Sequence, residues 1–244
     1  MMRRFWRRWI SFREVHLATL PSVIESVRVL VTTGSIDSVE PLLESASTLL
    51  EAEADPGVLM EFAKTCHAWG PPALEEAALR AAIARGVQLD AMEQLLFLLL
   101  QRIGVPNDAE MTSVVMEAES LGGEALRLLG ASSGARWANL ITARGRCRSL
   151  LAQVGKREHG PGARADLLAF RSWVDLGVDV PDHWSRANHR AIVDLDIAEL
   201  DILEGYGADA TRRLESAIAT LEAAKGSRFM IERGYELLAR SEEL

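Results

Sequence analysis

The sequence predicts an all-α protein in which antiparallel helix pairs stack as an α-solenoid or as an irregular helical-repeat bundle. Ala, Leu, Glu and Arg dominate its 244 residues, and such side chains lose little conformational freedom in a helix. Apolar residues recur with helical periodicity over most of the chain. Glycines and prolines divide that pattern into helix pairs that recur every 30 to 45 residues or so, a spacing typical of an α-solenoid.

The N-terminal half is expected to contain three helix pairs. In the first, Gly34 ends one helix and Pro56 follows the second. The expected helices after a first pair within residues 21–55 are 58–69, 73–85, 89–103 and 108–121. Residues 89–103 are apolar on nearly all sides, so we expect them in the middle of the body.

The C-terminal half is expected to resume the pattern after glycines at 122–123 and a loop at 131–134. Its expected helices are 136–154, 163–176, 184–204, 209–225 and 228 to about 240, the last as a cap. The segment 155–162, GKREHGPG, looks most like a loop. These breaks suggest an arm (1–15) and two helical-repeat subdomains (16–122 and 123–244).

Residues 192–221 allow two incompatible interpretations. As a strand and a turn, they would place Gly205-x-Gly207-x-x-Ala210 beneath a nucleotide phosphate. The segment before Gly205 carries five acidic residues, too many for a parallel strand that is buried on both faces. We therefore expect a helical hairpin with its turn at the two glycines.

The spacing of small and apolar residues in this hairpin resembles the tetratricopeptide repeat. The residues that carry the resemblance are Ile197, Ala198, Gly205, Ala210, Leu214 and Ala217. Fainter versions follow Gly34, Glu75 and Trp137, so the resemblance covers about half of the chain. It implies a protein-binding scaffold whose concave groove receives a peptide or a helix of another protein.

Other motifs provide little support for catalysis or metal binding. Residues 130–134 match the GxSxG pattern of serine hydrolases, but a helix, not a strand, is expected before them. Asp179, Asp182 and His183 are typical of a turn as well as of a metal site. Cys66 and Cys147 form no CxxC pair, which favours buried thiols in a cytoplasmic protein. We expect no catalytic residue, cofactor or metal.

The N-terminal arm, RRFWRRWISFR, is amphipathic and basic. Five arginines lie within the first thirteen residues, whereas the whole chain has a net charge of −8. The candidate binding residues of this arm are Arg3, Arg4, Trp6, Arg7, Arg8 and Trp9. Either the arm attaches to an anionic membrane surface, or its aromatic face covers one end of the helical body.

Acidic residues recur along the helix that is expected before Gly205, and they form a second candidate binding site. They are Asp194, Asp196, Glu199, Asp201 and Glu204. With Asp194 and Asp201 on one side and Asp196 and Glu199 near the opposite side, the helix is expected to be wedged between two neighbours. The acidic edges either are exposed and confer solubility, or form a groove for a basic segment such as the arm.

The leading hypothesis is a non-enzymatic, cytoplasmic adaptor that binds a protein partner through its helix faces. The acidic body is unsuited to nucleic acid, which requires a basic face. One alternative is a peripheral membrane protein anchored by its arm. Another is an enzyme on a helical bundle, which would require a buried cluster of polar side chains.

Overall fold

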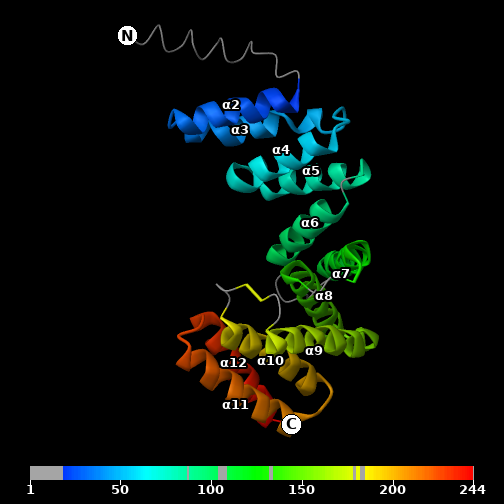
Figure 1. Cartoon of the computed structure of the whole chain (residues 1–244), viewed down its shortest axis with the longest axis vertical. Coiled ribbons are helices and arrows are strands. Elements are labelled where there is room, and N and C mark those ends of the chain that lie inside the picture. Colours follow the sequence, from blue (N-terminus) through cyan, green and yellow to red (C-terminus); the bar gives the residue numbers. More distant parts are fainter. Residues whose placement is uncertain are drawn as a thin grey trace. The chain divides into compact units, whose positions relative to one another are not determined.

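The all-α prediction is confirmed by the computed structural model, which describes residues 19–86, 88–103, 109–131, 134–177, 180–181 and 185–243 (Figure 1). Every regular element in these ranges is a helix. The chain divides into two compact units, Met1–Leu95 and Leu96–Leu244.

The first unit contains helix pairs near the predicted positions. Its elements are α2 (Leu20–Thr32), η1 (Ile36–Ser38), α3 (Val39–Ser45), η2 (Ser47–Leu49), α4 (Pro56–Trp69) and α5 (Pro72–Ala84). Gly34 follows α2 with a φ of 74°, a conformation that favours glycine. The second helix of the first pair is short and flanked by 3₁₀ turns. Asp55 caps α4 by accepting a hydrogen bond of 2.8 Å from the Gly57 amide.

The second unit continues the helical pattern. α6 (Leu89–Arg102) crosses from the first unit into the second and is followed by α7 (Ala109–Leu129), α8 (Ala135–Gln153), η3 (Arg157–His159), α9 (Gly160–Leu176), α10 (Arg186–Leu203), α11 (Gly207–Ala223) and α12 (Arg228–Glu242). Each predicted helix of this half is present with ends shifted by a few residues.

Two predictions about breaks in this half are wrong. The helix expected to end at residue 121 continues through Gly122 and Gly123 to Leu129, because Gly122 lies where α7 packs closely on α8. The expected loop at 155–162 is largely η3 and the first turn of α9. Pro161 fits there because the first turn of a helix leaves its backbone N–H groups unpaired.

Helix α10 is wedged between two apolar clusters, as predicted. Val193, Ile197 and Leu200 pack on α8 and α9. The opposite face, which includes Leu195 and Ala198, packs on α11 and α12. Gly205, with a φ of 83°, makes the turn into α11, so residues 192–221 form the predicted helical hairpin.

Helix α10 is the central element of the last five helices of the second unit. Helix α10 contacts α8 and α12, its next-but-one neighbours, and also α9 and α11. Small residues allow the close approach of α10 and α11, since Ala198, Ala210 and Ala217 are almost fully buried between them. Among the described helices, none is both long enough and apolar enough to cross a membrane.

The adjacent glycines of α7 provide a test of this packing. Gly123→Ala is expected to raise the free energy of unfolding by about 1 kcal/mol, because alanine favours a helix more than glycine does and no atom lies within 4 Å of the added Cβ. Gly122→Ala is expected to gain less, because its Cβ would lie 3.1 Å from the Cβ of Arg144. Urea unfolding measures both values, and equal gains would contradict close packing of α7 on α8.

Candidate functional site

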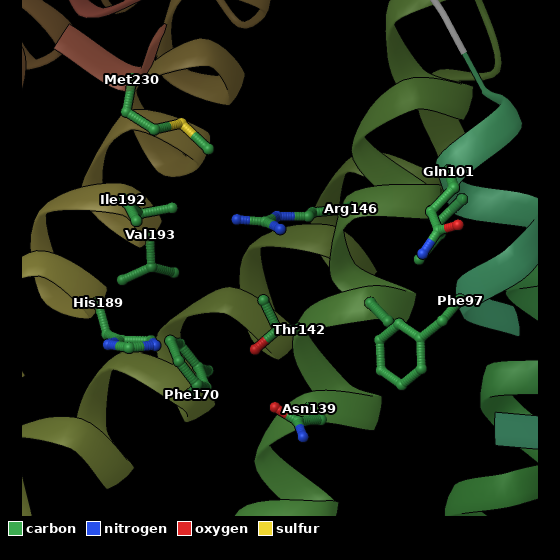
Figure 2. Close-up of a pocket in the computed structure, with 12 residues that line it drawn as sticks. Phe97, Gln101, Asn139, Thr142, Arg146, Phe170, His189, Ile192, Val193 and Met230 are labelled. Carbon is green, nitrogen blue, oxygen red and sulfur yellow. The ribbon is translucent and has the colours of Figure 1, made fainter. Parts of the chain in front are cut away.

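A groove of about 510 Å³ lies within the second unit (Figure 2). Helices α6, α8, α10 and α12 supply most of its lining, and Phe170 of α9 lies beneath them. Its volume falls in the range of ligand pockets, about 300 to 1,000 Å³. Phe97 and Leu100 belong to the apolar run of α6, and both stay partly exposed because they face this groove.

Polar side chains lie among the apolar walls of the groove. The Thr142 hydroxyl donates a hydrogen bond of 2.7 Å to the Ala138 carbonyl, and Nδ1 of His189 lies 2.9 Å from the Ser185 carbonyl oxygen. The carboxamides of Gln101 and Asn139, in contrast, have no hydrogen-bond partner among the described residues. Their donors and acceptors are therefore available to a ligand.

Arg146 supplies a permanent positive charge to the groove. On α8, Arg144 and Arg148 are one helical turn apart and both bind Asp166 of α9. Arg146 lies midway between them in sequence and therefore points the opposite way, towards α10. Its Nε donates a hydrogen bond of 2.9 Å to Asp196, and 40% of its side chain is exposed.

Arg146 begins a chain of alternating charges along one edge of α10. Arg233 of α12 binds the second oxygen of Asp196 at 2.7 Å and also binds Glu199 at 2.8 Å. Arg240 of α12 lies 3.5 Å from the other oxygen of Glu199. Three guanidiniums and two carboxylates leave this chain with one excess positive charge.

The other edge of α10 carries a second chain, which is neutral. Asp194 lies 3.0 Å from Arg171 and 3.5 Å from Arg213. Asp201 binds Arg213 at 3.2 Å and Arg164 at 2.7 Å. Arg164 also binds Glu204 at 2.8 Å. Three guanidiniums and three carboxylates therefore compensate one another.

Four of the five acidic residues are thus not exposed, so the expectation of exposed acidic edges is wrong for them, whereas Glu204 is exposed. Asp194, Asp196, Glu199 and Asp201 are all buried, and Glu204 is paired at the end of the helix. The edges are covered because the four helices packed around α10 direct arginines onto them. A basic segment approaching this stripe would meet carboxylates that already have guanidinium partners.

The pKa values of Asp196 and Asp194 are shifted in opposite directions. Burial acts to raise the pKa of Asp196, but Arg146 and Arg233 outweigh it and hold the pKa below its ordinary value. Burial also acts on Asp194, where it outweighs Arg171 and Arg213 and raises the pKa. For Arg233, burial is outweighed by Asp196 and Glu199, which raise the pKa of the guanidinium.

Several other sequence motifs fall outside the described residues. They are Arg3, Arg4, Trp6, Arg7, Arg8 and Trp9 of the arm, the serines at 132–133 and the acidic turn at 179–183. Among the residues that are described, no group of three or more potential ligands could hold a metal ion. Cys66 and Cys147 are buried, and burial raises the pKa of each thiol to about 12.

Comparisons with known proteins identify no family. No protein-family model matches the chain, and no curated protein sequence matches it. The resemblance to tetratricopeptide repeats therefore rests on the residues of this chain alone. The groove is the feature that indicates what the protein does.

Sequence reasoning missed the groove residues, although one signal for Arg146 was present. Helix α8 contains four arginines and no acidic residue, whereas α10 contains four acidic residues, all between positions 194 and 201. Such a complementary pair predicts ion pairs between neighbouring helices. Nothing comparable distinguishes Gln101 or Asn139 from surface amides, because their importance depends on which helices meet around the groove.

The two edges of α10 are expected to respond differently to neutralisation. Asp196→Asn should lower the free energy of unfolding by about 3 kcal/mol at neutral pH, since it removes the buried charge that two partly buried guanidiniums share. Asp194→Asn should cost only about 1 kcal/mol, because the ionised form of Asp194 is already disfavoured by burial. Chemical unfolding at neutral pH compares the two variants.

The cost of Asp196→Asn is also expected to depend on pH. Because the folded-state pKa of Asp196 lies below the ordinary 3.8, its contribution is complete above that value and is lost as the pH falls through the lowered pKa. The gap between wild type and Asp196→Asn should therefore narrow below pH 3.8. A gap that stays constant in strong acid would argue against the pairing.

Proposed function

We propose that this protein is a non-enzymatic, tetratricopeptide-like scaffold that binds a partner protein by receiving an extended segment of it in the groove of the second unit. The observation that carries the proposal is the pair of carboxamides, exposed Gln101 and partly buried Asn139, which line the groove and have no hydrogen-bond partner among the described residues.

Carboxamides suit the backbone of an extended peptide. Each offers a donor and an acceptor, so it can pair with both the N–H and the C=O of one residue of an extended segment, whatever the side chain of that residue. Gln101 reaches the groove from α6 and Asn139 from α8 (Figure 2). A segment that crosses between these helices would therefore have its main chain held at two points.

The apolar walls supply places for the side chains of such a segment. Phe97 and Leu100 lie on the α6 side, and Ile192, Val193 and Met230 lie on the side of α10 and α12. Burial of apolar side chains supplies most of the affinity in sites of this kind, and a few polar groups fix orientation. The groove is lined in the same way, by mostly apolar side chains and a few polar ones.

The groove supports binding better than it supports catalysis. The buried polar cluster that an enzyme on this fold would require does exist, but each carboxylate of α10 has a guanidinium within 3.5 Å. General acid–base catalysis is favoured by a group whose pKa lies near the working pH, whereas Asp196, the carboxylate bound to the groove residue Arg146, has a pKa that is held low. The buried thiols Cys66 and Cys147 are consistent with the cytoplasmic location that forms part of this proposal.

Selection of short random peptides on the immobilised full chain tests this proposal. Peptides enriched on the wild type are expected to bind the double variant Gln101→Ala/Asn139→Ala at least about tenfold more weakly, because the hydrogen bonds of both carboxamides to the peptide backbone are lost. Fluorescence anisotropy with labelled peptides measures the dissociation constants.

Gln153→Ala is the matched control, because Gln153 lies on α8 but does not line the groove. It should bind the selected peptides as the wild type does. Failure to enrich any peptide, or equal binding to the wild type and the double variant, would contradict a peptide-binding groove.

A further inference from the structure

We infer that Arg146 binds the side-chain carboxylate of an Asp or Glu residue within the partner segment, so that the groove selects an acidic residue flanked by apolar ones. This inference rests on the proposed function. The charge of this partner segment is opposite to that of the basic segment that the sequence offered as one option for the acidic stripe.

The first argument is the charge balance around α10. The series of ion pairs through Asp194 and Asp201 is neutral, so it has no uncompensated charge for a ligand. The chain Arg146–Asp196–Arg233–Glu199–Arg240 has one positive charge in excess. One end of it, Arg146, lines the groove, whereas Arg240 is not among the lining residues.

The second argument is the way in which Arg146 is held. Its Nε binds Asp196, and Asp196 is itself held by Arg233, so the guanidinium is oriented before any ligand arrives. Its two Nη groups have no partner among the described residues. They form the edge of a guanidinium that pairs with a carboxylate through two parallel hydrogen bonds.

The third argument is the position of Arg146 in the groove. Figure 2 shows its side chain extending from α8 into the space between Gln101 on one side and Ile192 and Met230 on the other. Lining residues therefore continue on both sides of the charge. A residue inside the bound segment fits this position, because the segment can contact the groove before and after its acidic side chain.

The proposed ligand group is a carboxylate for a further reason. Among the described lining residues, Arg146 is the only one with a permanent charge. One guanidinium balances one carboxylate, whereas a phosphate group carries nearly two negative charges at neutral pH and would call for a second cation.

A double-mutant cycle tests the inference with a peptide selected on the wild type. Changing its acidic residue to the corresponding amide is expected to weaken binding to the wild-type chain about tenfold, because a charge-assisted pair is lost. On Arg146→Gln the same peptide change should have almost no effect, since its partner is gone. Isothermal titration calorimetry provides the four dissociation constants.

Arg240→Gln is the matched control. This substitution removes one positive charge from the other end of the same series of ion pairs. The side chain of Arg240 is 49% exposed, compared with 40% for Arg146, and Arg240 does not line the groove. Although this change removes the excess charge, it leaves both Nη groups of Arg146 in the groove, so the variant should keep most of the wild-type preference for the acidic peptide. Amidation of the peptide's C-terminus should also leave binding unchanged, and a loss of binding on amidation would overturn the assignment to a side chain.

The outcomes separate this inference from the proposed function. If the peptides require Gln101 and Asn139 but the acid-to-amide effect persists on Arg146→Gln, the inference is wrong and the peptide groove stands. If no peptide binds, both fail. Should Arg146→Gln not fold, Arg146→Lys replaces it: its ammonium cannot hold Asp196 and present a two-donor edge to the ligand. An undiminished acidic preference on that variant would overturn the inference.

Discussion

The pairing of the α10 carboxylates with six arginines is the interaction on which the second unit depends. Asp196 and Glu199 on one edge, and Asp194 and Asp201 on the other, lie between two apolar clusters that α10 itself separates. Without their arginines these carboxylates would be unpaired charges in the interior, which is strongly unfavourable. The apolar faces of α10 can therefore be buried only where α8, α9, α11 and α12 bring guanidiniums to its edges.

Buried ion pairs of this kind specify an arrangement more than they stabilise it. The free energy of removing the charges from water offsets much of their attraction, so well-packed apolar residues of the same volume can be as stable. What the pairs provide is discrimination, because a shift of α10 along its neighbours would separate Asp201 from Arg164 and Asp196 from Arg146. The same pairs orient Arg146 in the groove, so the helix that organises the unit also prepares its candidate binding site.

The fold was largely predictable from the sequence, and the candidate site was not. Helix periodicity and helix-ending residues such as Gly34 and Gly205 are local signals, and they placed most helices to within a few residues. The same local rules predicted a break at Gly122, because they cannot detect that a glycine is required for close contact with another helix. The stripe containing Asp194 and Asp196 was recognised, but its burial was not, since burial depends on arginines up to fifty residues away in the sequence. Gln101 and Asn139 acquire their importance only when α6 and α8 border one groove.

The two charge chains also limit how far this array is modular. In an ideal repeat protein, each hairpin contacts its neighbours through a common apolar surface, so hairpins can be deleted, duplicated or exchanged. The hairpin of α10 and α11 does not have that freedom, because Arg146, Arg171 and Arg233 belong to three different helices and each is matched to a particular carboxylate. Removing or exchanging this hairpin would leave arginines without partners on α8, α9 and α12. The order of the helices in this unit is therefore specified by charge as well as by shape.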